Sequence, residues 1–420
     1  MKETCKTIVA LILGLMAATI LMLLINLLPE KAMKQHITES VKVMEQEQDY
    51  HEVIPGMISS RLDNFTDSIM LVSSAHKAET GLIDRTMNGY RVLYEGKTPS
   101  ETLAAYGTGE EGYSVSPYSR YWHGYQIILK PLLLFFNYQE IRYLNMCLQF
   151  LLIIGIVIEM VKKKMGIYIF SYMVMLFSLM PFSIGLSLQF SSVFYITNIA
   201  VYVLLKWFEI IKEKKNFFLF FLIVGMLTSF MDLLTYPLVT LGIPLVFYFL
   251  LMEKKTLLYN VIKTVKYSII WAIGYIGMWS GKWIIGSILL RKNIITDAID
   301  ALLNRTSSET ADASFTHWSV IEKNTGAMFS TPVKLLFLGT LLILLVVLIC
   351  KTIRDRKNYF ANWHYLLIAC MPIAWYMVAA NHSYMHFWFT YRELSILIFA
   401  VLIWESANVK QCIKANNMEC

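Results

Sequence analysis

The sequence predicts an all-α polytopic membrane protein with about ten transmembrane helices and a large first extracytoplasmic loop. Of its 420 residues, 56% are hydrophobic and only 16% are charged, and the mean hydropathy is +0.52. Soluble domains carry about a quarter of their residues as charges, so this chain has too few polar side chains to cover a globular surface. The composition also excludes a disordered chain, and six cysteines are too few for a disulfide-stapled secreted scaffold.

Ten apolar runs in the sequence are candidate membrane helices. A helix rises about 1.5 Å per residue, so about 20 apolar residues span a hydrocarbon core of about 30 Å. The runs are residues 7–28, 141–160, 166–185, 191–207, 217–234, 236–252, 267–289, 333–350, 365–380 and 386–404. The first run exceeds the apolar core of a signal peptide and lacks a clean small-x-small cleavage site, so we interpret it as an anchor.

The basic residues predict how these helices are oriented. If ten helices are threaded alternately, the lysine and arginine clusters fall on one side of the membrane; they lie within residues 2–6, 162–164, 206–215, 254–266, 351–357 and 410–414. Positive charge marks the cytoplasmic side, so we expect a plasma-membrane protein with both termini in the cytoplasm. The net charge of +7 then reflects topology and does not indicate nucleic acid as a partner.

This topology divides the chain into five parts. They are the N-terminus with the first helix (1–29), an extracytoplasmic loop of domain size (30–125), an interfacial helix with helices two to seven (126–290), a second extracytoplasmic loop (291–332), and the last three helices with a cytoplasmic C-terminus (333–420). The sequence contains no P-loop, no H-E-x-x-H and no G-x-S-x-G. We therefore expect any activity on the external side or in a cavity within the membrane.

The most informative part of the first loop is the segment 59–72, which carries two aspartates. Its apolar residues recur at three- and four-residue intervals, which predicts a helix capped by Ser59 or Ser60. Asp63 and Asp67 are four residues apart, so their carboxylates lie one turn apart on one flank. Repulsion and burial would raise one pKa toward the range of a general base. The alternative is a solvated polar face.

Two further segments supply polar groups near the external surface. In residues 118–125, Arg120 and His123 are candidate donors to a sugar ring or a lipid phosphate, and the alternative is an ordinary interfacial aromatic belt. Asp232 lies between the fifth and sixth helices and is followed by Tyr236. A carboxylate at that depth is costly unless it is paired or hydrated, so Asp232 either has a structural partner or lines a site.

The densest cluster is residues 381–393, where the ninth helix meets the tenth. His382 and His386 are four residues apart, and Tyr391 and Arg392 follow. Arginine and histidine donors favour a bound phosphate at the membrane surface. Two histidines at this spacing also match a pair of divalent-metal ligands, but the sequence offers no third ligand, so we predict no cofactor and no metal site.

Together these features resemble the GT-C superfamily of integral-membrane glycosyltransferases, in a bacterial branch. The resemblance rests on the topology and on the segments 61–67, 121–125, 232–237 and 382–392. It implies transfer of a sugar from a polyprenyl-phosphate lipid to a cell-surface glycan or lipid-linked acceptor on the external side of the membrane. In one departure, Asp63 follows the first helix at a greater distance than the acidic residue common in that superfamily.

The resemblance also implies roles for the candidate residues. Asp63 would be the base that accepts the proton of the acceptor hydroxyl, with Asp67 as alternate or partner. Arg392, His386 and Arg120 would stabilise the charge that grows on the leaving phosphate. Two other classes stay open at this point: a transporter or flippase of lipid-linked sugars, and a non-catalytic membrane protein that binds cell-envelope glycan.

Overall fold

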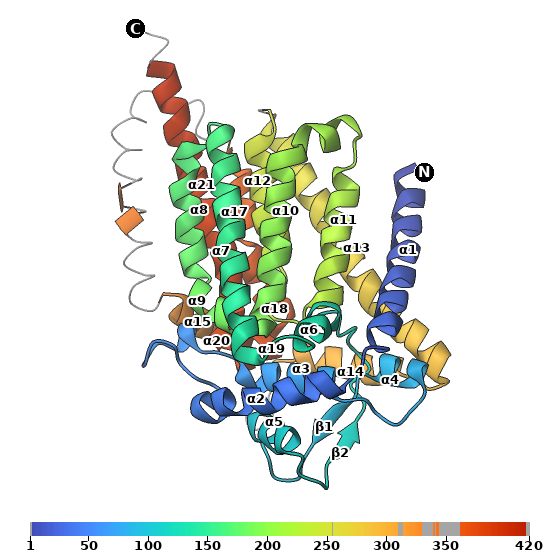
Figure 1. Cartoon of the computed structure of the whole chain (residues 1–420). Coiled ribbons are helices and arrows are strands. Elements are labelled where there is room, and N and C mark those ends of the chain that lie inside the picture. The colour runs from blue at the N-terminus through green and yellow to red at the C-terminus, as the bar shows by residue number, and fades with distance from the viewer. Residues whose placement is uncertain are drawn as a thin grey trace.

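The structure is a computed structural model that describes residues 2–253, 255–309, 314–329, 339–340, 342–343 and 362–416. These residues are mostly helical, with one two-stranded sheet among them (Figure 1). Five of the described helices are long and apolar enough to cross a membrane: Glu3–Ile25, Tyr138–Lys162, Leu188–Glu213, Leu257–Leu290 and Phe387–Asn408. Shorter apolar helices are Gly166–Ser178, Phe217–Met231, Val239–Leu251 and His364–Val378.

The predicted all-α class and its apolar helices are therefore present, and the count of ten membrane helices stays a prediction. The eighth predicted helix, residues 333–350, lies almost wholly outside the described residues. So does the basic cluster at 351–357. The division of the chain into five parts also stays a prediction.

Long helices lie side by side in the bundle, and short helices cover one end of it (Figure 1). The bundle helices are α1 (Lys2–Ile25), α7 (Tyr138–Lys162), α8 (Gly166–Ser178), α10 (Leu188–Glu213), α11 (Phe217–Met231), α12 (Val239–Leu251), α13 (Leu257–Leu290), α17 (His364–Ala369), α18 (Met371–Val378) and α21 (Ser395–Asn416). The start of α1 and the end of α21 lie at the same end of the bundle, at the top of the view.

The opposite end of the bundle carries the outer layer. Its elements are α2 (Lys31–Glu47), η1 (Ile58–Ser60), α3 (Asn64–Ala75), α4 (Leu82–Asn88), β1 (Arg91–Leu93), α5 (Pro99–Thr108), β2 (Ser114–Ser116), α6 (Gln126–Leu133), α9 (Pro181–Leu186), α14 (Ile295–Thr306), α15 (His317–Met328), α19 (Ala380–Met385), α20 (Phe387–Thr390) and η3 (Tyr391–Leu394). β1 and β2 pair antiparallel, with Val92 opposite Val115. A core that includes Ile37, Leu71 and Leu103 joins α2, α3 and α5.

The third predicted run, 166–185, is broken rather than continuous. α8 ends at Ser178, and α9 begins at Pro181. Met180 has a φ of 57°. A proline ring disfavours helical backbone at the residue before it, so the helix cannot pass through this point. The break places the short helix α9 at the outer end of the bundle, beside the start of α10.

Two glycines allow α11 and α13 to pack closely. A side chain at Gly225 would collide with the Trp271 carbonyl oxygen, and one at Gly274 would collide with the Leu222 carbonyl oxygen. The backbones of the two helices therefore approach each other directly, as small residues permit in helices that pack within membranes.

Candidate functional site

A cavity of about 410 Å³ opens between the outer layer and the end of the bundle. This is within the range of about 300–1,000 Å³ that is typical of small-molecule sites. We call it the outer cavity. Its polar and charged lining residues are Tyr50, Asp63, Thr66, Arg91, Tyr118, Arg120, Tyr121, Tyr125, Gln189, Asn304, Arg305, Asn381, His382 and His386. Four of the residues singled out from the sequence, Asp63, Arg120, His382 and His386, are thus brought together.

Asp63 is the carboxylate of the outer cavity; no other acidic side chain occurs among the described lining residues. It caps α3, because Oδ1 accepts the Thr66 backbone N–H at 3.0 Å and Oδ2 accepts the Thr66 hydroxyl at 3.1 Å. The expectation that Ser59 or Ser60 caps this helix is wrong, because the two serines form the short helix η1 and an extended Arg61 follows them.

Burial raises the pKa of Asp63 to about 7, and the nearby Asp67 and Asp49 carboxylates add to the shift, while the hydrogen bonds from Thr66 oppose it. The carboxylate is only 2% exposed. A carboxylate with a pKa near neutrality can accept a proton and hold it at physiological pH.

Asp67 lies one turn further along α3 and does not line the outer cavity. Its Oδ2 accepts the Tyr138 hydroxyl at 2.6 Å and the Leu188 N–H at 2.7 Å, and Oδ1 accepts the Gln189 N–H at 2.8 Å. Both oxygens therefore bind groups at the start of α10, where free backbone N–H groups attract a carboxylate. This arrangement joins α3 to the bundle.

Arginines supply the positive charge of the outer cavity. Arg120 stacks over Tyr118, with 4.9 Å from the guanidinium carbon to the ring centre, and one of its nitrogens lies 3.5 Å from the exposed Asp297 carboxylate. Arg305 of α14 donates from Nη2 to the Tyr121 hydroxyl at 2.8 Å. Arg91 of β1 also stacks on Tyr118, at 5.2 Å. The sequence indicated only Arg120 of these three.

The two histidines of the cavity are adjacent, with ring centres 4.8 Å apart. The Nε2 atom of His382 lies 2.7 Å from the Leu234 carbonyl oxygen, so Nε2 carries the proton. Burial lowers the pKa of His382 well below its usual value, and the nearby His386 and Arg305 lower it further. His382 is therefore neutral at pH 7, and arginine supplies the charge that an anion would meet.

Aromatic rings form one wall of the outer cavity. Tyr50 stacks on Phe65 at 5.8 Å and meets Trp388 edge-on at 5.6 Å. Arg61 lies 5.9 Å from both the Tyr50 and the Trp388 ring centres. These contacts join the first loop to the segment before η3, two regions far apart in the sequence.

Arg392 lies next to this wall but outside the outer cavity. It is fully buried: Nε donates to the Leu179 carbonyl at 2.9 Å, Nη2 donates to the Ser183 hydroxyl at 3.0 Å, and the guanidinium stacks on Phe190. These bonds join η3 to the chain around the break between α8 and α9. The sequence pattern of residues 381–393 does not reveal that the Arg392 side chain points away from the outer cavity.

Two candidate tyrosines are buried and bonded to backbone carbonyl oxygens. Tyr391 donates to Ser59 at 2.8 Å, and Tyr236 donates to Phe190 at 2.5 Å. Neither lines the outer cavity. Their hydroxyls join separate segments of the chain.

Asp232 and His123 also lie behind the cavity wall. Asp232 accepts the Thr235 N–H at 2.9 Å and its hydroxyl at 2.5 Å, which closes the turn between α11 and α12. His123, with a φ of 56°, has Nε2 at 2.9 Å from the Tyr118 carbonyl and Nδ1 at 3.3 Å from the Tyr125 hydroxyl. It thus holds two tyrosines that line the cavity.

A buried network supports the residue next to Asp63. Arg142 binds both carboxylate oxygens of Glu47 at 2.8 Å each and donates to Asn64 Oδ1, also at 2.8 Å. Asn64 in turn donates from Nδ2 to Glu47 at 3.0 Å. This network joins α2, α3 and α7, and it fixes the backbone at the start of α3.

An apolar groove of about 450 Å³ adjoins the outer cavity, and Tyr125 lines both. The groove runs between α6, α7, α10 and α11; its lining includes Ile128, Leu144, Leu148, Ile199 and Leu227. Ile128, Leu148 and Ile199 are about half exposed. The groove therefore has an apolar surface on the side of the bundle where lipid would lie.

Within the described residues, no group of three or more His, Cys, Asp or Glu side chains is placed to hold a metal ion. The chain matches no protein-family model, no curated protein and no solved structure. The function is therefore inferred from the geometry of the outer cavity.

Proposed function

We propose that this protein is a membrane glycosyltransferase of the GT-C type. In this proposal it transfers a sugar from a polyprenyl-phosphate donor to a cell-surface glycan or lipid-linked acceptor on the external side of the plasma membrane. The observation that carries the proposal is the outer cavity, which is lined by one carboxylate of raised pKa, Asp63, and by three arginines.

The proposed reaction is a single displacement at the anomeric carbon of the donor. The acceptor oxygen forms a bond to that carbon, and the bond from the carbon to the phosphate oxygen breaks. The acceptor proton passes to Asp63, and the bonding electrons leave with the lipid phosphate. Phosphate is a good leaving group, so one base is sufficient and the anomeric configuration inverts.

The arginines suit the leaving group. Negative charge grows on the phosphate as the bond breaks, and guanidinium groups fixed before the reaction stabilise that charge without having to move. Arg120 and Arg305 are each held by contacts with Tyr118, Tyr121 or both. We assign the phosphate to these two residues and to Arg91, because all three line the outer cavity and Arg392 does not.

The apolar groove supports a lipid-linked donor. A polyprenyl chain has no polar groups, and its transfer from water to an apolar surface is favourable by about 25 cal/mol per Å² buried. In the proposal this chain lies along Ile128, Leu148 and Ile199, and its phosphate reaches the outer cavity beside Tyr125.

The test is incorporation of radiolabel from a polyprenyl-phosphate sugar into cell-envelope glycan or lipid by the purified protein in nanodiscs. The proposal expects labelled product with inverted anomeric configuration. Since the sugar and the acceptor are open, a panel of polyprenyl-phosphate hexoses and pentoses is assayed with a total envelope extract as acceptor.

The same preparation distinguishes the two other classes. Movement of the labelled lipid across a vesicle membrane without a new glycosidic bond would support a transporter or flippase. Tight glycan binding with neither transfer nor movement would support a non-catalytic binding protein. Either result would overturn the glycosyltransferase proposal.

A further inference from the structure

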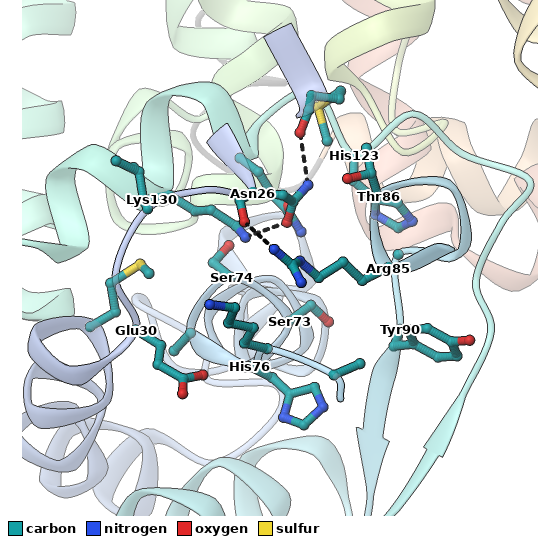
Figure 2. Close-up of a pocket in the computed structure, with 18 residues that line it drawn as sticks. Asn26, Glu30, Ser73, Ser74, His76, Arg85, Thr86, Tyr90, His123 and Lys130 are labelled. Carbon is teal, nitrogen blue, oxygen red and sulfur yellow. Dashed lines mark hydrogen bonds between the residues drawn. The ribbon is translucent and has the colours of Figure 1, made fainter. Parts of the chain in front are cut away.

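A second polar pocket lies on the other side of His123, between the end of α1 and the outer layer (Figure 2). Its lining includes the polar and charged residues Asn26, Arg85, Thr86, Lys130 and the acid Glu30. None of these residues lines the outer cavity, so the pocket is separate from the site described above.

Two cations meet in this pocket, and no carboxylate of the residues that the structure describes forms an ion pair with either. The ammonium group of Lys130 is 5% exposed and donates to the side-chain oxygen of Asn26 at 2.7 Å. Arg85 donates to the backbone carbonyl of the same Asn26 at 3.2 Å and to that of Thr80 at 3.3 Å. Figure 2 shows both side chains reaching Asn26. Buried charges are normally paired with opposite charge, so this arrangement of cations favours a bound anion.

The other charged groups around the pocket do not supply that anion. Glu30 lines the pocket but is paired with Lys34, whose ammonium group lies 3.6 Å from the buried Oε2 atom of Glu30. Lys77 adds a further positive charge to the lining. Burial lowers the pKa of Lys130, the nearby Arg85 and Lys77 add to this shift, and Glu30 opposes it. The resulting pKa is about 8, so Lys130 still carries a proton at pH 7.

A separate observation points to a ligand. Thr86 is 3% exposed and lines the pocket, yet its hydroxyl has no hydrogen-bond partner in the described part of the chain. The Nε2 atom of His76, in the same lining, is also buried without a partner. A buried polar group without a partner costs free energy, and a bound anion or its oxygen atoms would remove that cost.

The size and the place of the pocket indicate which anion. The enclosed space is about 20 Å³, which admits one or two oxygen-sized atoms and not a whole headgroup. Asn26 directly follows α1, and both Leu24 near the end of that helix and Leu27 just beyond it are more than half exposed. The pocket therefore lies where the apolar surface of the first helix ends, at the depth at which lipid phosphates occur in a bilayer.

We propose that this pocket binds the phosphate of an anionic ligand, with Lys130 and Arg85 as its charged donors and Thr86 as a neutral one. The phosphate oxygens enter the pocket, and the rest of the ligand stays outside. The phosphate is that of an anionic phospholipid or free inorganic phosphate. This site is independent of the proposed glycosyl transfer.

The experiment measures the Tm of the purified full chain in detergent as ligand is added. The ligands are phosphatidylglycerol, zwitterionic phosphatidylcholine as the comparison lipid, and inorganic phosphate. A ligand that binds only the folded state stabilises it by RT ln(1 + c/Kd), where c is the free ligand concentration, so Tm rises once c passes Kd. We expect phosphatidylglycerol or inorganic phosphate to raise the Tm of the wild type more than phosphatidylcholine does.

The variants are Lys130→Gln and Arg85→Gln, and the control is Lys292→Gln, an exposed cation outside the pocket. Each pocket variant should need about tenfold more ligand for the same rise in Tm, and the control should match the wild type. Without ligand, Lys130→Gln should be at least as stable as the wild type, because it removes one of two repelling cations. If Lys130→Gln does not fold, Arg85→Gln makes the comparison alone.

The two sources of phosphate give different results. A response to phosphatidylglycerol alone identifies a lipid site, and a response to inorganic phosphate at similar concentration identifies a site for the free anion. The proposal is overturned if the wild type responds to neither ligand, or if both pocket variants respond as the wild type does.

Discussion

Arg142 and Glu47 form a buried two-bond ion pair, with both nitrogen–oxygen distances at 2.8 Å. The pair connects α7 of the bundle to α2 of the outer layer, and the same guanidinium binds Asn64, the residue after Asp63. The position of the candidate base therefore depends on a contact between the bundle and the outer layer.

We predict that Arg142→Met destabilises the protein strongly. The substitution leaves the Glu47 carboxylate, with only 22% of its side chain exposed, without its partner. Loss of one member of a buried pair typically costs about 3–5 kcal/mol. Thermal unfolding of the purified variant measures the effect. Lys97→Met, which breaks the exposed pair with Glu110, should cost at most about 1 kcal/mol. Equal losses in the two variants would contradict the assigned role of Arg142.

We predict that Asp67→Asn affects folding more than Asp63→Asn does. Asp67 accepts two hydrogen bonds from backbone N–H groups at the start of α10 and a third from the Tyr138 hydroxyl of α7. An amide nitrogen in place of one carboxylate oxygen would face a donor. The expected loss is about 1–3 kcal/mol. Asparagine caps helices about as well as aspartate, so Asp63→Asn should keep α3 intact. Unfolding curves of the two variants, measured side by side, test this order.

The pKa of Asp63 predicts how stability depends on pH. This acid has a pKa of about 7 in the folded protein and 3.8 as its ordinary value, so the folded state binds the proton more tightly. The stabilisation is complete below about pH 4 and is lost as the pH rises through about 7. The stability of the wild type should therefore fall relative to that of Asp63→Asn between pH 5 and pH 8, by about 3 kcal/mol. Parallel stability curves of the two proteins over this range would contradict the assignment.

The same pKa predicts the pH profile of the proposed reaction. Asp63 must be ionised to accept a proton, so kcat/KM should rise about tenfold per pH unit below pH 7 and level off above it. The profile is measured by label transfer at saturating acceptor. A profile that is flat from pH 5 to pH 8 would show that another group accepts the proton.

We predict that Arg305→Gln weakens the stabilisation of the donor phosphate during the reaction. Loss of a charged hydrogen bond costs about 1.5–3 kcal/mol, which lowers kcat/KM about 10- to 100-fold. Tyr121→Phe is the matched control, because it removes the partner of Arg305 and keeps the cation. Its effect should be only a few-fold. If both variants behave alike, Arg305 acts only by supporting Tyr121.

The sequence predicts the helical class and indicates part of the outer cavity. Apolar composition and the spacing of apolar residues are local properties of the sequence, so the apolar runs identify helices. The break that Pro181 makes in the third run depends on the backbone conformation of a single residue. Asp63, Arg120, His382 and His386 carry side chains typical of a polar site, and the fold places all four in one cavity.

The remaining members of the cavity give no signal in the sequence. Arg305 and Arg91 lie in a loop helix and a three-residue strand, where a lone arginine looks like any solvated cation. Arg392 shows the opposite case. Its sequence neighbours suggest a hydrogen-bond donor to phosphate, but its side chain binds Leu179 and Ser183, which lie more than 200 positions away in the sequence. Direction of a side chain cannot be deduced from spacing alone.

The most direct test of the central claim compares label transfer from a polyprenyl-phosphate sugar by the wild type and by Asp63→Asn, with donor binding measured on the same preparations. We predict that the variant binds the donor as the wild type does and loses at least about 100-fold in kcat, since it lacks the base. Transfer by Asp63→Asn within a few-fold of the wild-type rate would contradict the account.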